Sequence, residues 1–218
     1  MRTVPAALAL VAAGSVGAVG MAGAASAAHD ENPSPKVASY SYGLSPVQAE
    51  SVPNSQASGT TRVKALPNGK VQVKVRASGL APNLPHAMHL HGVPGEATDL
   101  GCPGPAADTD GNGFVTTLEG VPFYGGIVAS LTTTGDTTPT SALALDRFPV
   151  ADAAGNLSYS RTFRSEPASA DAGTVQVVVH GIDINGNGSY DFEAGPSSLT
   201  DEFPLEGTIP VLCGGIPN

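Results

Sequence analysis

The sequence predicts an all-β protein, an antiparallel sandwich or barrel with long loops. Residues 60–65 and 71–76 flank an Asn68-Gly69 turn signal and form the clearest hairpin of the chain. The composition of 27 glycines, 19 prolines and no tryptophan in 218 residues favours strands joined by turns over a helical bundle. No segment carries a convincing apolar period for a helix of three turns.

The predicted hairpin alternates valine with polar residues in its second strand, at Val71, Val73 and Val75. This period of two places one face in the core and the other in water. Asn68 and Gly69 supply the positive φ angles that a tight turn needs. Six further strands are predicted at residues 37–44, 86–93, 126–131, 157–163, 174–180 and 208–213. Some of the segments between them are 10 to 30 residues long, and loops of that length in a compact domain usually carry function.

The N-terminal segment, residues 1–27, has the pattern of a secretory signal peptide. Arg2 provides the positive start, residues 6–23 form the apolar run, and Ala25-Ser26-Ala27 is a small-residue cleavage site. We therefore expect a secreted protein without a membrane span, a flexible leader at 28–36 and a single β domain at 37–218. Cleavage one residue later would make His29 the N-terminal residue, able to bind copper through its amine and ring.

The formal net charge of −9 argues against nucleic acid and anionic lipid as partners. Most basic residues lie between Lys36 and Arg76, and most acids lie from Glu96 onward. The lysines and arginine of the hairpin's second strand, Lys70, Lys74 and Arg76, are expected to form a solvated strand face. The oligomeric state does not follow from the sequence.

Cys102 and Cys213 are the two cysteines. In the oxidising environment that follows export, an even number of cysteines suggests one disulfide, with two free thiols as the alternative. The two cysteines are 111 residues apart in the sequence. A disulfide that closes a loop of this length stabilises the folded state by about 4–5 kcal/mol on the chain-entropy model.

Three of the five histidines lie within six residues, at His86, His89 and His91. On a strand His89 and His91 share one face, with Cβ atoms about 6–7 Å apart, while His86 faces the other side. His180 ends the valine-rich strand at 174–180, and a site of three imidazoles results if the two strands are neighbours. Imidazole suits copper, zinc, nickel and iron. The alternative is that these histidines are rim residues bonded to loop backbone.

Four short segments resemble, in order, those of the secreted copper/zinc superoxide dismutase superfamily. They are the His89-Leu90-His91 strand, Cys102 in the following loop, Val177-Val178-Val179-His180-Gly181, and Val211-Leu212-Cys213-Gly214-Gly215-Ile216. The resemblance implies a Greek-key β-sandwich or barrel, copper on His89, His91 and His180, a Cys102–Cys213 disulfide, and superoxide as the substrate.

The sequence departs from this family at several functional positions. No histidine lies between His91 and His180, where the family has a bridging histidine and two zinc histidines, so a zinc subsite is not expected. Pro210 stands where the family has its active-site arginine. Dismutation with reduced or lost efficiency is therefore the leading hypothesis, and whether the chain is an enzyme stays open.

The N-terminal half also resembles the CHRD (chordin-type) domain. The matching segments are Gln56-Ala57-Ser58-Gly59, Gly79-Leu80 and His86-Ala87-Met88-His89-Leu90-His91-Gly92. This resemblance implies the alternative function, a non-catalytic extracellular domain that binds a protein or a surface.

Two acidic loops complete the candidate sites. Asp108, Asp110, Asn112 and Glu119 fit the spacing of a twelve-residue calcium loop with Gly113 at its turn, although no helix is expected before it. The alternative is an Asx-rich surface turn. The segment 183–191 begins similarly, but Ala194 stands at its twelfth position. Asp183 is a candidate to accept the second ring N–H of a metal-binding histidine.

Overall fold

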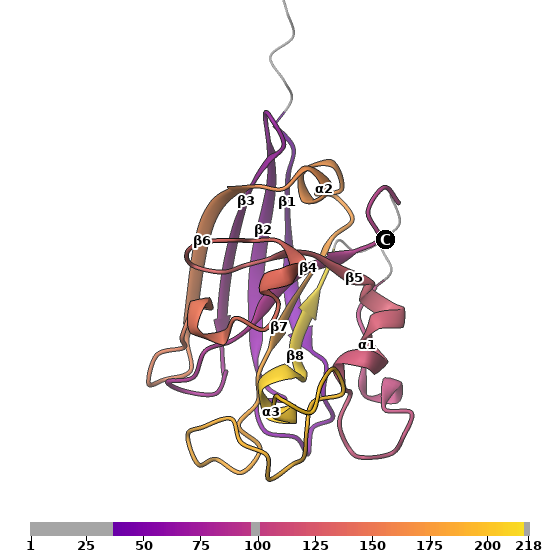
Figure 1. Ribbon diagram of the computed structural model, residues 1–218, viewed down its shortest axis with the longest axis vertical. Coiled ribbons are helices and arrows are strands. Elements are labelled where there is room, and N and C mark those ends of the chain that lie inside the picture. The colour runs from indigo at the N-terminus through magenta and orange to yellow at the C-terminus, as the bar shows by residue number, and fades with distance from the viewer. Residues whose placement is uncertain (1–36, 97–100, 216–218) are drawn as a thin grey trace, which may run out of the picture. The chain divides into compact units, whose positions relative to one another are not determined.

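Eight strands, each antiparallel to its neighbours, form one sheet with the order β5-β4-β7-β8-β1-β2-β3-β6 (Figure 1). The computed structural model describes residues 37–96 and 101–215. The strands are β1 Ser39–Pro46, β2 Ser58–Leu66, β3 Lys70–Ser78, β4 Met88–Gly92, β5 Gly126–Ser130, β6 Leu157–Arg164, β7 Gln176–His180 and β8 Pro210–Gly214. Each overlaps one predicted strand, so the all-β antiparallel prediction is confirmed.

The β2–β3 hairpin has the predicted turn. Asn68 and Gly69 have φ angles of 62° and 65°, and the nine residues of each strand pair from Ser58↔Ser78 to Leu66↔Lys70. Along β3 the residues alternate between buried valines and polar side chains at the surface. The alternation directs Val71, Val73 and Val75 to one face, and that face lies in the core.

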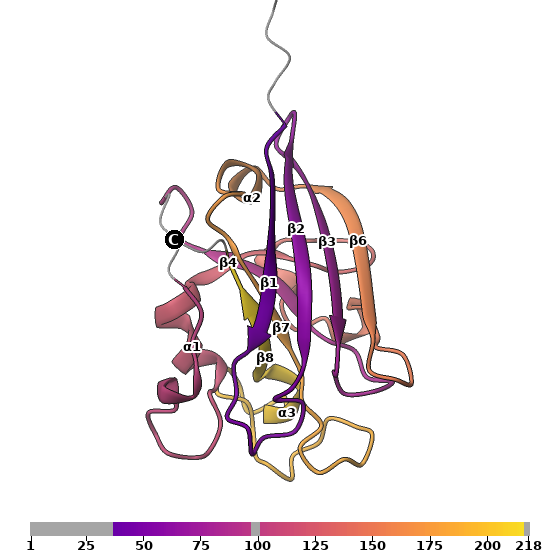
Figure 2. The same cartoon turned by 180° about the vertical axis from the view of Figure 1, so that it is seen from behind.

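The sheet curls so that two half-sheets enclose the core. β6, β3, β2 and β1 make one half, and β8, β7, β4 and β5 make the other. The halves are joined through the short β1–β8 pairing of Ser45 with Cys213 and Pro46 with Leu212. Figures 1 and 2 show the two layers from opposite sides. The chain passes between the halves from β3 to β4, from β5 to β6 and from β6 to β7, which is the kind of crossing expected of Greek-key topology.

Apolar side chains from both halves meet in one core cluster. Val63, Val73 and Val75 come from the first half, and Leu90 and Val177 come from the second. Strands β4, β7 and β8 are buried along their whole lengths. Side chains on these three strands are therefore held in packed surroundings, which fixes the direction of every histidine they carry.

The helical segments are short, as the sequence predicts. They are α1 Thr117–Tyr124, α2 Glu166–Ala170 and α3 Leu205–Thr208, with 3₁₀ turns η1 Pro105–Ala107, η2 Pro139–Ser141 and η3 Leu145–Arg147. α1 begins with a capping box, in which Thr116 and Glu119 each accept a hydrogen bond from the other's backbone amide. Within 37–96 and 101–215 no helix has the length and apolar character needed to cross a membrane.

Cys102 and Cys213 form a disulfide across 111 residues of sequence. The predicted pairing is confirmed, and a disulfide is consistent with an extracellular location. The predicted signal peptide and leader lie outside the described residues, as does Ile216 of the C-terminal segment.

Candidate metal centre

His89 and His91 lie on β4, and His180 ends the neighbouring strand β7. β4 sits between β5 and β7, and its register with β5 shifts between Leu90 and His91. The register of β7 with β8 shifts between Val179 and His180. All three histidines are buried, with 2–4% of their surface exposed. The prediction that the two histidine-bearing strands are neighbours in the sheet is confirmed.

The three imidazoles converge. One ring nitrogen from each residue lies within 4.8 Å of the other two. The ring centroids of His89 and His180 are 5.1 Å apart, and those of His89 and His91 are 5.6 Å apart. Three nitrogen atoms at this separation can ligate one metal ion.

Backbone carbonyls determine which nitrogen of each ring faces the cluster. Nε2 of His89 lies 3.1 Å from the carbonyl oxygen of Ala142, Nδ1 of His91 lies 3.0 Å from that of Gly125, and Nδ1 of His180 lies 2.6 Å from that of Thr208. A carbonyl oxygen only accepts, so each of these nitrogens carries the proton and donates. The second nitrogen of each ring then carries a lone pair.

The three lone-pair nitrogens are His89 Nδ1, His91 Nε2 and His180 Nε2, and all three are buried without a hydrogen-bond partner. A buried polar atom without a hydrogen-bond partner is costly, and a metal ion is a partner that imidazole nitrogens accept. Metal-bound histidines usually donate the remaining N–H to a carbonyl or a carboxylate, which is the arrangement found here. The donor set therefore fits a metal ion.

Burial keeps the three rings neutral. Desolvation lowers the pKa of His89 well below 6.5, and charged forms of His180 and His91 would lower it further. Desolvation, followed by the proximity of His180, lowers the pKa of His91 to about 3. Desolvation lowers the pKa of His180 to about 4, against a smaller upward effect of the Thr208 carbonyl. At neutral pH none of the three needs to lose a proton before it binds a metal.

The cluster faces a small cavity of about 30 Å³ with an almost wholly apolar surface. Besides the three histidines it is lined by Ala87, Thr117, Ile127, Ala142, Leu143, Leu199 and Thr208. The Thr117 hydroxyl already donates to the Thr208 carbonyl at 2.6 Å. No lysine, arginine or acid is among these lining residues. The space holds no more than one or two water-sized molecules.

His86 is separate from the cluster. It precedes β4, is fully buried, and places its two ring nitrogens 2.9 and 3.0 Å from the carbonyl oxygens of His180 and Ala81. Neither nitrogen is directed to the other histidines. Burial lowers the pKa of His86, although both carbonyls act in the opposite direction. His86 therefore links the two histidine strands instead of supplying a fourth ligand.

The predicted contact between Asp183 and a histidine is wrong. Its carboxylate accepts the amides of Asn187 at 3.1 Å and Gly188 at 2.8 Å, in the loop that follows β7. The carbonyl of Thr208 stands beside His180 in its place. Asp183 therefore organises its own loop, and a backbone oxygen far along the sequence orients the ligand.

The predicted calcium loop brings Asp108, Asp110 and Glu119 together, with one oxygen of each within 4.8 Å of the others. Asn112 caps the loop by accepting the Phe114 amide, and η1 stands where a preceding helix would be. The Glu119 carboxylate accepts the amides of Thr109, Asp110 and Thr116 and the hydroxyls of both threonines. These hydrogen bonds outweigh desolvation and lower the pKa of Glu119 to about 2.

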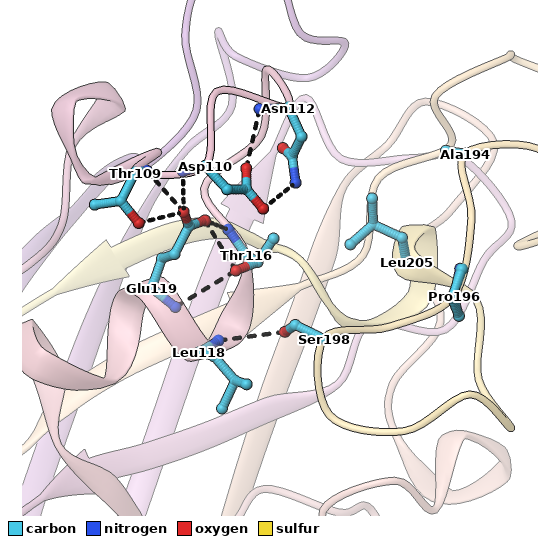
Figure 3. Close-up of a pocket in the computed structure, with 10 residues that line it drawn as sticks. All are labelled: Thr109, Asp110, Asn112, Thr116, Leu118, Glu119, Ala194, Pro196, Ser198 and Leu205. Atoms are coloured by element: carbon cyan, nitrogen blue, oxygen red, sulfur yellow. Dashed lines mark hydrogen bonds between the residues drawn. The ribbon is translucent and has the colours of Figure 1, made fainter.

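The same loop borders a cleft of about 390 Å³ (Figure 3). Glu119 and Asp110 lie on one side, and Pro196, Ser198 and Leu205 lie on the other. The hydrogen bonds of Figure 3 place the Glu119 carboxylate at the centre of the loop. Calcium binding here stays a prediction.

Sequence reasoning missed the residues that enclose the metal centre. Ala142 and Leu143 precede η3, and Leu199 lies between β7 and α3. The carbonyls of Gly125 and Thr208 are likewise far from the histidines in sequence. No local pattern marks these positions, because each contact is set by the packing of separate loops. The capping box Thr116-x-x-Glu119 did carry a local signal.

No protein-family model matches the chain, and no curated protein matches it either. Among solved structures the chain matches a mutant of superoxide dismutase 5 from Candida albicans. The match has 16% sequence identity and a TM-score of 0.34, and it covers 82% of this chain and 88% of that chain. No family model supports either the superoxide dismutase or the CHRD resemblance. A TM-score of 0.34 is too low for the likeness to bear on the activity or the ligands of this chain.

Proposed function

We propose that this chain is a secreted copper-binding protein whose ion is held by His89 Nδ1, His91 Nε2 and His180 Nε2. The observation that carries the proposal is the convergence of three buried lone-pair nitrogens, none of which has a hydrogen-bond partner. A neutral site made only of imidazoles favours copper over the other divalent first-row metals. The cluster includes no carboxylate, and no zinc subsite is proposed.

We propose superoxide dismutation of low efficiency as the activity. Bound copper would supply one-electron chemistry, in which two superoxide ions and two protons give one molecule of oxygen and one of hydrogen peroxide. The chain's own residues limit this reaction, because the lining of the small cavity contains no cation to attract the anion. Pro210, at the start of β8, provides no positive charge at the position where the family has arginine. An anion that enters an apolar cavity without a partner loses its hydration at considerable cost.

Metal analysis of the protein recovered from the culture medium tests the binding site. We expect about one copper per chain after loading with Cu(II), and loss of that copper in His89→Gln, His91→Gln and His180→Gln. Thr162→Gln is the control, because it introduces glutamine at an exposed position of β6, in the other half-sheet, and should keep the copper. Retention of copper by all three ligand variants would refute the site.

A second control isolates the N-terminal alternative. His29→Gln should leave the copper content unchanged, and N-terminal sequencing of the secreted protein identifies the residue that follows cleavage.

A copper-loaded sample with no superoxide-dependent activity would refute dismutation while leaving copper binding intact. If copper neither binds nor raises the stability, the non-catalytic CHRD-type alternative is the better explanation.

A further inference from the structure

The outer face of the β2–β3–β6 sheet gathers most of the described positive charge. Eight lysines and arginines lie in the described residues, and two of them, Arg147 and Arg161, donate to the loop at 132–136. The other six belong to the outer face: Arg62, Lys64, Lys70, Lys74, Arg76 and Arg164. Figure 2 shows this half-sheet in front of the other half. We call these six residues the cationic face.

The strand register places like charges opposite one another. Arg62 is paired with Lys74 across β2 and β3, and Lys70 is paired with Arg164 across β3 and β6. Directly opposed like charges destabilise a sheet. β1, β2, β3 and β6 contain no aspartate or glutamate. Within the described part of the chain, only Arg164 of the six has an ion pair, with Glu166.

This arrangement contrasts with the charge of the whole chain, which is −9. Acids outnumber bases by 19 to 10, yet none is placed on these strands to neutralise the cationic face. A folded domain tolerates a group of like charges without neutralising acids, but at a cost in stability. An anionic ligand that spans several of these cations would offset that cost and would find the charges already positioned.

Polar uncharged side chains occupy the rest of the face, apart from Leu66 at the end of β2. Two shallow depressions of about 300 and 340 Å³ lie along β2 and β3, and they share Thr60 and Arg76. Ser41, Arg62 and Lys74 complete the first depression, together with Thr61. The second includes Ser58 and Ser78. The two form a continuous strip of hydroxyl groups and cations. Successive outward side chains on one strand are about 7 Å apart, so the strip presents charges at regular intervals.

We propose that the cationic face binds an anionic polysaccharide laid along β2 and β3. Hydroxyl groups between the cations suit the hydroxyls of sugars. The outward positions of β2, β3 and β6 include no aromatic side chain. Single-stranded nucleic acid is usually held by bases stacked on aromatic rings, so this face lacks the usual platform for it. Export of the chain, which the signal peptide predicts, would bring it among such polymers.

Retention of the full-length protein on immobilised dextran sulfate tests the proposal, with uncharged dextran as the reference matrix. We expect binding at low salt that weakens steeply as salt rises, because each neutralised charge releases a counterion. Lys74→Gln/Arg76→Gln should weaken binding at about 0.1 M salt by about tenfold or more. Both side chains are exposed on the strand surface, so the double variant should remain folded.

The matched control changes the net charge by the same two units, but at positions outside the cationic face. Ala106→Glu/Thr134→Glu alters two exposed positions outside the cationic face and should bind dextran sulfate as tightly as the unmodified protein. Equal weakening in both double variants would show an effect of net charge alone and would refute the proposal. Failure of the unmodified protein to bind, or displacement by single-stranded DNA at the same charge concentration as readily as by soluble dextran sulfate, would also refute it.

Discussion

Three carbonyl oxygens decide which nitrogen of each clustered histidine is available for a metal. They belong to Gly125 after α1, Ala142 after η2 and Thr208 at the end of α3, in three connections outside β4 and β7. The strands bring the rings together, and the loops select the tautomers. A substitution that shifts one of these loops is therefore expected to weaken metal binding without touching a ligand.

The depressed histidine pKa values predict a pH-dependent stability of the metal-free protein. His91 and His180 have folded-state pKa values of about 3 and about 4, against 6.5 for an unperturbed ring. Between these values the unfolded chain binds protons that the folded chain does not, so stability is complete above pH 6.5 and is lost as the pH falls towards 4. Urea unfolding at pH 7.5 and pH 5 should show a lower midpoint at pH 5.

A separate group of carboxylates contributes to the pH dependence of stability only at lower pH. Hydrogen bonds hold the pKa of Glu119 and of Asp136 at about 2. Their stabilising effect is present above the unfolded pKa, near 4, and is lost below it, so the interval from pH 6.5 to 4.5 reports on histidines. His180→Gln should flatten the dependence in this interval. An unchanged urea midpoint between pH 7.5 and 5 would contradict the buried neutral state of the cluster.

At the scale of elements, Glu119 holds the start of α1 and the preceding loop together. Its carboxylate accepts amides from Thr109, Asp110 and Thr116. Glu119→Ala removes the carboxylate that accepts from all three amides and should lower the free energy of unfolding by about 1–3 kcal/mol. Chemical denaturation measures this change. Glu202→Ala, at an exposed position, is the control and should have almost no effect. Equal stability of the two variants would show that the capping box is dispensable.

The β2–β3 turn makes a second prediction at this scale. Gly69 has a φ angle of 65°, which an L-residue adopts only with strain. The added Cβ also meets the exposed side chain of Glu166, so Gly69→Ala is compared in the background of Glu166→Ala, where it should cost about 1–2 kcal/mol, seen as a lower thermal midpoint. Gly126 is exposed, has no positive φ angle and has no atom near the position of an added Cβ. Gly126→Ala should leave the midpoint nearly unchanged, and a comparable loss there would argue against backbone strain as the cause.

The strands follow from the sequence because their signals are local. The valine alternation of β3 and the Asn68-Gly69 turn identify the hairpin directly. His89 and His91 share a face for the same reason, a period of two. The partner of Asp183 and the position of His86 depend on loop packing, which no local period encodes. α1 had a local signal, the capping box of Thr116 and Glu119, but the same glutamate also completed a calcium-loop pattern, and the sequence alone does not separate the two roles.

At the scale of the whole molecule the two half-sheets differ in character. One half carries the buried histidine cluster on β4 and β7, and the other presents the cationic face. The halves are joined in the sheet by the pairing of Ser45 with Cys213 and of Pro46 with Leu212, and the Val47 amide extends it by donating to the Val211 carbonyl oxygen. Cys213 also pairs with Val178 on β7, so the disulfide fastens the segment at Cys102 to the strand where the halves meet.

Removal of the disulfide should therefore have a large effect on stability. The bond closes 111 residues, and the chain-entropy model assigns such a loop about 4–5 kcal/mol. Guanidinium unfolding of Cys102→Ala/Cys213→Ala should show a loss of this size. The protein reduced with dithiothreitol should behave like the double variant, since both lack the same restraint on the unfolded chain. Because the restraint acts mainly on the unfolded state, copper content should be unchanged wherever the variant remains folded. A loss below about 1 kcal/mol would mean that the unfolded chain stays compact without the bond.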